Sequence, residues 1–540
     1  MTDGWSLPRR EAWLTALGIF VVALVVRALT ASIIGFPKPE DTAYYVAVAR
    51  NLLDGRGLVF DGLWSYGTPP LEVPRAAFEV WLPLPTFLAA ASMAVFGESF
   101  AAAQVSSVVV GAIVPVLAWR LAADVARELE LPVGRARTLA IGAGLTTAVY
   151  LPLLLHSALP DSTMTFTALA LIAVLLMTRL LRDPHGAKFW DPRLLGLGVV
   201  LGLAALTRNE AVWLALVWAG MAWSADHFPK VDRIRLVGVV ALVAVVVFWP
   251  WALRNWGEFG SPLPSQTATN ALSLTGIDIF AWNDPPTLRR YLDVGVQELI
   301  RMRVTGFLHN LLNVLVLLGL PLSVLGVISI PLVWPSRSLR PLAWYSLITF
   351  LFTCLVFPVA TTWGTFLHAA GPVHVWLVIG ALLLLDAFIA RVGERRGWTR
   401  PVAWLGPALA IFGSVLFSLV LLPAFGRGSI ETRDYYAALG PAMAVAGHPL
   451  DDEAGPVISD FPIWLADTQG IRALALPDEP PKDVFDLARH FPGTRYVVLS
   501  EGTDHAHWPE DFDAGVGWSE CFRSIDIGLP PTRVFEIVCR

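Results

Sequence analysis

Two adjacent carboxylates, Glu40 and Asp41, stand just beyond the end of the first apolar stretch of the sequence. A third carboxylate, Asp161, lies between two later apolar stretches, shortly after His156. Such a side chain can take the proton of a hydroxyl group while that hydroxyl attacks an electrophilic carbon. The alternative is structural, because aspartate also caps helices: a helix is expected after Asp41, and an apolar stretch starts at Ser162. The sequence therefore offers two candidate acidic sites, each with helix capping as its alternative.

The composition is that of a membrane protein. The chain has 540 residues, 55% of them hydrophobic and only 15% charged, whereas a soluble globular protein carries roughly 25% charged residues. Its 22 tryptophans and 28 phenylalanines suit a large lipid-facing and interfacial surface. No stripe of basic residues indicates a nucleic acid. Membrane lipids are therefore expected around the chain, and nucleic acid is not expected as a partner.

The distribution of lysine and arginine predicts how the chain crosses the membrane. Apolar stretches occur near residues 12–34, 100–119, 138–155, 162–181, 194–207, 211–225, 236–252, 306–333, 341–357, 371–390 and 402–422. If all of them cross and residues 81–96 form an interfacial or re-entrant helix, basic loops alternate with loops that lack positive charge. About eleven spans result. The N-terminus is then cytoplasmic at an inner (plasma) membrane, and residues 35–99, 253–305 and 424–540 lie outside.

The last external segment is expected to fold as a small α/β domain. Short β-type runs at residues 455–459, 495–499 and 533–538 alternate with a helical stretch at 482–490. We therefore divide the chain into a membrane domain (1–424) and an external domain (425–540). Cys521 and Cys539 both fall in the external domain, where they pair if it is outside the cytoplasm and stay free otherwise.

Arg208 and Arg254 depart from the charge pattern, because both lie at external ends of apolar stretches. A guanidinium group matches the oxygens of a phosphate, so phosphate binding is one explanation for each. Extension of the side chain to the membrane interface is the alternative, and Glu210 could instead neutralise Arg208. His156, on the same face, could contact a phosphate or an acceptor, or it could be structural.

Ordered motifs over residues 12–425 resemble a known family of membrane enzymes. Asp-x-x-Tyr-Tyr begins at Asp41 and is followed by Ala-Arg-Asn-Leu-Leu-x-Gly-x-Gly. GLAALTRNE begins at Gly202, and WPWALRNW begins at Trp249 and is followed by FGSP. The order and spacing of these motifs resemble the C-type glycosyltransferase fold. Its closest branch is the family of protein O-mannosyltransferases and lipid A aminoarabinose transferases.

The resemblance implies an α-helical polytopic enzyme that moves a monosaccharide from a polyprenyl-phosphate carrier to an external hydroxyl, with inversion at the anomeric carbon. It assigns Asp41 as the base and Asp161 as its acidic partner, which in more distant branches binds a divalent metal. The best-known branches carry Asp-Glu at the first site. Here Thr42 occupies the Glu position, and Glu40 is the register-shifted alternative. Together with His156, Glu40 and Tyr44 are further candidate contacts for substrate or phosphate.

The chemistry of such a transfer supports this assignment independently. A base must take the acceptor proton while an oxocarbenium-like centre develops. Because a polyprenyl phosphate is already a good leaving group, it needs cations more than an acid. The lipid tail of the donor lies in the bilayer, so the reaction must occur at the membrane surface. No cofactor is required, although a divalent metal is compatible with this chemistry. The sugar is not specified, and the acceptor could be a protein, a lipid or a glycan.

Two other classes of function fit many spans and scattered polar residues. A transporter or flippase for lipid-linked sugars predicts paired broken helices or an inverted repeat. The sequence shows neither. A non-catalytic envelope assembly factor would use the external domain to bind a partner. Under both alternatives substitution of Asp41 should leave the activity of the protein unchanged, whereas loss of transfer with normal folding supports the enzyme.

Overall fold

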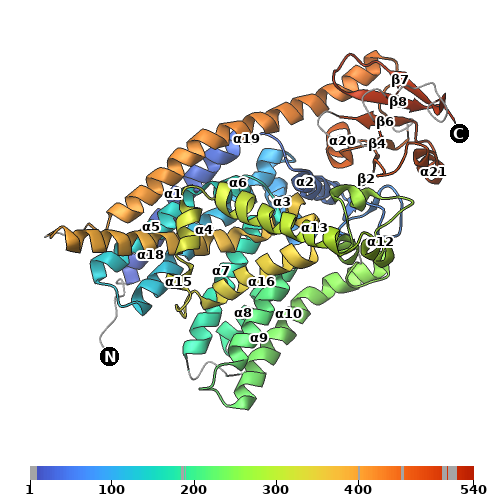
Figure 1. The fold of residues 1–540 in the computed structure, drawn as a ribbon. Helices are drawn as coiled ribbons and strands as arrows, with labels where there is room; N and C mark the ends of the chain where they lie inside the picture. The colour runs from blue at the N-terminus through green and yellow to red at the C-terminus, as the bar shows by residue number, and fades with distance from the viewer. Residues whose placement is uncertain are drawn as a thin grey trace.

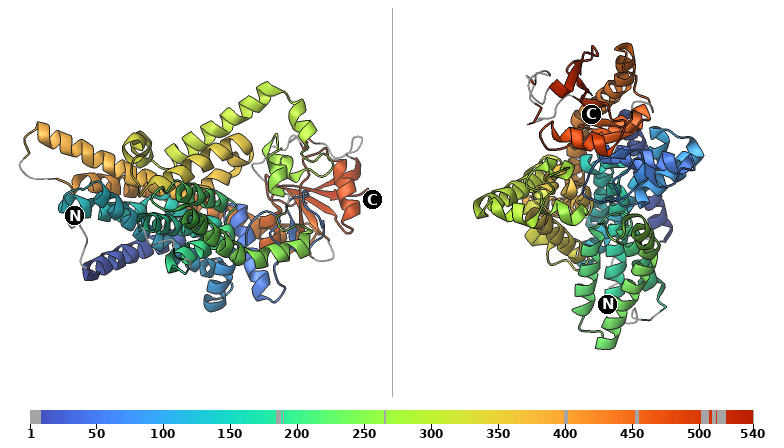
Figure 2. Two further views of the ribbon diagram at one scale, coloured as in Figure 1. Left: turned by 90° about the horizontal axis from the view of Figure 1, so that it is seen from below. Right: turned by 90° about the vertical axis from the view of Figure 1, so that its right-hand side faces the viewer.

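The computed structural model describes residues 9–183, 188, 190–264, 266–398, 402–451, 455–500, 507–508, 512 and 520–539. Helices form an elongated bundle, and a small α/β domain projects from one end of it (Figure 1). Figure 2 shows the N-terminus and the C-terminal domain at opposite ends of the molecule. The placement of the two on opposite sides of a membrane stays a prediction.

Among the described residues, six helices are long and apolar enough to cross a membrane. They are α1 (Arg9–Ile33), α4 (Phe100–Glu128), α7 (Ser162–Arg182), α10 (Lys230–Phe259), α18 (Gly371–Arg395) and α19 (Leu405–Val445). Two bent pairs raise the number to eight if each pair is one span. The first pair joins α5 (Val133–Val149) to α6 (Leu151–Ser157) at 54°. The second joins α13 (Val296–Leu308) and η2 (His309–Leu317) to α14 (Leu322–Ile328) at 119°.

Shorter helices complete the bundle and its external segments. Four of them are apolar: α3 (Leu84–Phe96), α8 (Pro192–Ala205), α9 (Ala211–Trp223) and α16 (Arg340–Val356). The others are α2 (Glu40–Leu53), α11 (Gln266–Asn270), η1 (Gly276–Phe280), α12 (Leu288–Asp293), α15 (Ile330–Val333), η3 (Ala360–Trp363) and α17 (Thr365–Ala369). The chain is thus a multi-pass membrane protein. The prediction of about eleven spans requires α8, α9 and α16 to cross as well. The interfacial or re-entrant role of residues 81–96 stays a prediction.

A buried arginine and two glycines show how the bundle is held together. Arg27 in α1 is fully buried and donates to Ser157 Oγ (2.9 Å) and to the carbonyl of Ala148 (3.0 Å). It therefore ties α1 to the break between α5 and α6, where backbone carbonyls lack helical partners. Gly198 and Gly202 let α8 approach α10, since a Cβ at either position would lie 2.6 Å from a valine side chain.

The C-terminal domain is built on a six-stranded sheet that includes a strand from the first external segment. The strand order is β2-β5-β4-β6-β8-β7, parallel from β2 to β6 and antiparallel from there to β7. These strands are β2 (Gly62–Leu63), β4 (Val457–Ser459), β5 (Ala473–Ala475), β6 (Tyr496–Leu499), β7 (Phe522–Ile525) and β8 (Arg533–Ile537). The helices of the domain are α20 (Pro462–Gln469) and α21 (Asp483–His490). The structure has three strands and a helix at the four stretches predicted from the sequence.

Two features of this domain go beyond the sequence-based expectation. Helix α19 runs without a break from the bundle to the domain, across the predicted division at residue 424, which stays a prediction (Figure 1). The pairing of β2 with β5 joins the first external segment to the domain. Separately, β1 (Val59–Phe60) and β3 (Arg75–Ala76) form a two-stranded ribbon in that segment. Cys521 and Cys539 form a disulfide, which resolves the alternative left open by the sequence.

Candidate functional site

Helix α2 carries Asp41 into a largely buried position at the end of the bundle. The helix begins at Glu40 with Pro39 before it, and nine of its 14 residues are buried. The capping role considered for Asp41 is wrong, because the residue lies inside the first turn instead of before it. One oxygen, Oδ1, accepts from the N–H of Thr42 at 2.8 Å. The other, Oδ2, is available to a group outside the helix.

Asp161 has the capping role and a second contact. Its Oδ1 accepts from the N–H of Thr163 (2.8 Å) at the start of α7. Its Oδ2 lies 2.9 Å from Nδ1 of His156, which the end of α6 carries. The carboxylate is fully buried. The break between α5 and α6 therefore presents an imidazole to the acidic residue at the start of the next helix.

His368 joins the two acidic residues. Its Nε2 lies 3.1 Å from Oδ2 of Asp41, and its Nδ1 lies 3.5 Å from Oδ2 of Asp161. The same Nδ1 is 2.8 Å from the hydroxyl of Thr163. We call Asp41, Asp161, His156 and His368 the acid–imidazole cluster. The sequence analysis did not select His368, although it lies in an external turn free of lysine and arginine, which was a usable signal.

Three groups of the acid–imidazole cluster, Asp41, Asp161 and His368, are poorly solvated and have shifted pKa values. Burial raises the pKa of Asp41 above its usual value, against the opposing effect of His368. Burial also disfavours the charged form of Asp161, but His156 and His368 outweigh it and lower the pKa of that carboxyl. Burial acts to lower the pKa of His368, yet Asp41 and Asp161 raise it overall. Two carboxyls with pKa values shifted in opposite directions are typical of an acid–base site.

Arg208 lies beside the cluster, whereas Arg254 lies in another part of the external face. Arg208 donates to the hydroxyl of Ser162 (2.9 Å), next to Asp161, and pairs with Glu210 at 2.7 Å. Arg254 donates to the carbonyl of Ala77 (2.7 Å) in the first external segment. It also reaches the carbonyl of residue 58 and stacks on the rings at 251 and 259. Within the described part of the chain, no hydrogen bond or ion pair links Arg254 to the cluster.

Tyr44 and Glu40 make contacts that point away from the cluster. The hydroxyl of Tyr44 accepts from the N–H of Phe78 (2.7 Å) and donates to Glu79 (3.4 Å) within an aromatic core. Oε1 of Glu40 accepts from the N–H groups of Ile463 and Trp464, at 3.0 and 3.3 Å, at the start of α20. Of the residues selected from the sequence, the structure thus brings together Asp41, Asp161 and His156, with Arg208 at the edge.

Three members of the cluster could hold a metal ion. Ligand atoms of His156, Asp161 and His368 all lie within 4.8 Å of one another, and all three residues are buried. Two imidazoles and one carboxylate are a ligand set that suits divalent transition metals and leaves coordination positions open. The residues present therefore fit a divalent cation of that kind.

Comparison with solved structures identifies the fold. The chain matches no protein-family model, and no curated protein matches its sequence significantly. ArnT from Cupriavidus metallidurans bound to undecaprenyl phosphate is similar over 97% of this chain and 98% of its own, with a TM-score of 0.53 and 15% identity. The Archaeoglobus fulgidus oligosaccharyltransferase, solved with Zn and sulfate, is similar over 88% of this chain and 67% of its own, with a TM-score of 0.53 and 15% identity. The chain therefore has the C-type glycosyltransferase fold, with a small C-terminal α/β domain.

Proposed function

We propose that this protein is a membrane glycosyltransferase that moves a monosaccharide from a polyprenyl-phosphate carrier to a hydroxyl group on the outer side of the membrane. The single observation that carries the proposal is the acid–imidazole cluster. Asp41 and Asp161 come from segments far apart in the sequence, and His368 from a third segment holds them together. Such convergence at the ends of membrane helices is expected for a site that handles a lipid-linked substrate, and neither helix capping nor solvation explains it.

In the proposed reaction Asp41 is the base. Its carboxylate takes the proton of the acceptor hydroxyl while the hydroxyl oxygen bonds to the anomeric carbon. The bond from that carbon to the phosphate oxygen breaks on the opposite face, and the polyprenyl phosphate leaves with the electron pair. The buried setting suits this role, because it raises the pKa of Asp41 and so makes the carboxylate a stronger base. Asp161 and His368 keep Asp41 in position.

The leaving phosphate needs positive charge near the cluster. Arg208 is the better placed of the two arginines, since it contacts Ser162 beside Asp161. Arg254 stays a candidate for a more distant part of the donor, because its guanidinium already holds backbone carbonyls. A divalent cation held by His156, Asp161 and His368 would supply further positive charge for that phosphate. The likeness to ArnT bound to undecaprenyl phosphate supports a polyprenyl-phosphate donor.

The test is a transfer assay with matched aspartate variants on one helix. The full-length protein is purified, reconstituted in liposomes and supplied with a panel of undecaprenyl-phosphate-linked monosaccharides and membrane acceptors. Asp41→Asn should abolish transfer. The control is Asp54→Asn, which removes an exposed carboxylate at the end of the same helix and should leave transfer unchanged.

The same assay distinguishes the other classes of function. If the wild-type protein moves lipid-linked sugars across the bilayer without transferring them, and Asp41→Asn does the same, the protein is a transporter. If neither transfer nor translocation occurs with any donor of the panel, an assembly role is favoured. Each result would overturn the proposed function.

A further inference from the structure

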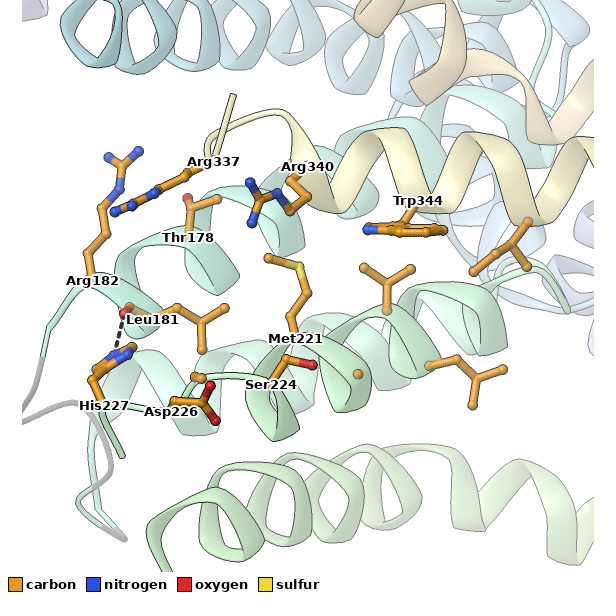
Figure 3. Close-up of a pocket in the computed structure, with 15 residues that line it drawn as sticks. Thr178, Leu181, Arg182, Met221, Ser224, Asp226, His227, Arg337, Arg340 and Trp344 are labelled. Atoms are coloured by element: carbon orange, nitrogen blue, oxygen red, sulfur yellow. Dashed lines mark hydrogen bonds between the residues drawn. The ribbon is translucent and has the colours of Figure 1, made fainter. Parts of the chain in front are cut away.

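A cavity of about 890 Å³ lies between α7, α9 and α16. Figure 3 shows the side chains that line it. None of the candidate site residues selected from the sequence is among them. One end of the cavity carries three arginines, Arg182, Arg337 and Arg340. Figure 3 shows Trp344 farther along the cavity, and the apolar lining also includes Leu216 from α9. We call this cavity the basic pocket.

The charges of the basic pocket are not balanced within the protein. Glu128 is engaged by Arg182 at 3.6 Å and by backbone N–H groups, including that of Arg337. The acidic residue that lines the pocket, Asp226, pairs with an arginine outside it at 3.1 Å. Within the described ranges, no carboxylate lies within 4.0 Å of the guanidinium of Arg337 or Arg340. Arg337 and Arg340 are exposed, line a partly apolar cavity, and have no acidic partner among the residues that the structure describes.

The basic pocket and the acid–imidazole cluster lie at opposite ends of α7. Asp161 precedes the first residue of this helix, and Arg182 is its last residue. A helix of 21 residues is about 30 Å long, which equals the thickness of the hydrocarbon core of a bilayer. The pocket therefore opens at the headgroup level of the leaflet opposite the candidate active site. By the predicted topology this is the cytoplasmic leaflet.

We propose that the basic pocket binds one anionic phospholipid of that leaflet. The phosphate lies between Arg337 and Arg340, because guanidinium groups match phosphate oxygens. An acyl chain lies along the apolar side, against Leu216 and Trp344, which are 53% and 42% exposed in the protein alone. Basic pockets between membrane helices are suited to anionic headgroups. If these arginines served only to keep this end of the helices on the cytoplasmic side, no cavity with an apolar wall would be needed beside them.

The occupant is a phospholipid and not free phosphate, because more of the lining is apolar than basic. Leu181, Val217, Met221 and Ile348 join Leu216 in it. A phosphate ion would leave these side chains in contact with water, whereas an acyl chain removes them from water at a gain of about 25 cal/mol per Å². The proposal does not depend on glycosyl transfer, since it rests on the far end of α7.

The test measures lipid retention by native mass spectrometry. The full-length protein is extracted from nanodiscs that contain equal amounts of phosphatidylglycerol and phosphatidylcholine. The wild type should retain phosphatidylglycerol in preference. The double variant Arg337→Gln, Arg340→Gln should lower that preference at least about tenfold, since both charge-assisted contacts to the phosphate are removed. The matched control is Arg391→Gln, Arg395→Gln, which removes two exposed arginines at the end of α18, outside the pocket, and should change the preference less than about twofold.

A second variant tests the apolar part without changing charge. Gly220 lines the pocket, and a Cβ there meets no other atom within 4 Å. Gly220→Phe places a ring in this part of the pocket with room for its Cβ, and it should lower retention of phosphatidylglycerol by at least about tenfold. Equal retention by the double variant and its control would overturn the proposal. So would full displacement of the lipid by inorganic phosphate, or unchanged retention by Gly220→Phe.

Discussion

Replacement of His368 by alanine should slow sugar transfer by roughly 10- to 150-fold. The imidazole Nε2 lies at ion-pair distance, 3.1 Å, from the Asp41 carboxylate, and Thr163 and Asp161 hold the other ring nitrogen. A charge-assisted contact contributes about 1.5–3 kcal/mol, and each 1.36 kcal/mol is about tenfold in rate. Because His368 positions Asp41, the loss should appear mainly in kcat.

Imidazole added to the His368→Ala variant separates positioning from a purely structural role. The free ring should occupy the space left by the side chain and restore part of kcat, without restoring any activity to Asp41→Asn. The control is His374→Phe. His374 is a buried histidine of α18 whose ring nitrogens have no hydrogen-bond partner among the described residues, so an aromatic replacement should leave kcat unchanged. A His368→Ala variant with wild-type kcat, or one that imidazole does not rescue at any concentration, would refute the reasoning.

Two further predictions concern the contact of the C-terminal domain with α2 and its own stability. Glu40→Ala should weaken docking of the C-terminal domain on α2 by about 1–3 kcal/mol, because the N–H groups of Ile463 and Trp464 lose their acceptor. Glu40→Gln keeps an acceptor oxygen and should preserve the docking. Hydrogen exchange at α20 measures the effect of each variant. Burial raises the pKa of Glu40 from 4.5 to about 8, against those two N–H groups, so the folded state holds a proton that the unfolded chain loses. Stability should therefore fall as pH rises between those values, and Glu40→Gln should not show this dependence in a thermal melt. Replacing Cys521 and Cys539 by serine should destabilise the domain by about 3 kcal/mol, because the disulfide closes a loop with a sequence separation of 18; a urea-unfolding midpoint equal to that of the wild type would contradict this.

Patterns along the chain predicted what depends on local chemistry. The β-type runs of the C-terminal domain were found because short apolar runs bounded by polar or turn residues are typical of buried strands, and β4 and β6 are buried along their whole length. Asp41 and Asp161 were selected because the resemblance to C-type glycosyltransferases assigns an acidic residue to each of these positions. The structure brings both carboxylates into contact with His368, as expected if the positive-inside rule places both on one face.

What the sequence could not supply are contacts that depend on tertiary packing. The lack of lysine and arginine around His368 indicates only the face on which it lies, and the packing of α17 against α7 is what brings it to the two acidic residues. Tyr44 was selected from its motif, yet the rotation of α2 turns it to an aromatic core. The hydroxyl of Tyr45, by contrast, hydrogen bonds with Ser162 beside Asp161. The 14 residues of α2 point in all directions around the helix axis, and the sequence alone does not tell which side a neighbouring helix covers.

Strand β2 has a consequence for biosynthesis. Its two residues are translated early, but β5, to which it pairs, and α20, which binds Glu40, emerge more than 400 residues later, as the separation of 423 between Glu40 and Ile463 shows. The segment that carries Asp41 is therefore translocated long before its partners exist. A ribosome that stops short of the last hundred residues would release a chain whose first segment, with Asp41, lacks the strands that complete its sheet. The segment that carries β2 can therefore reach its final structure only after the C-terminal domain has been synthesised.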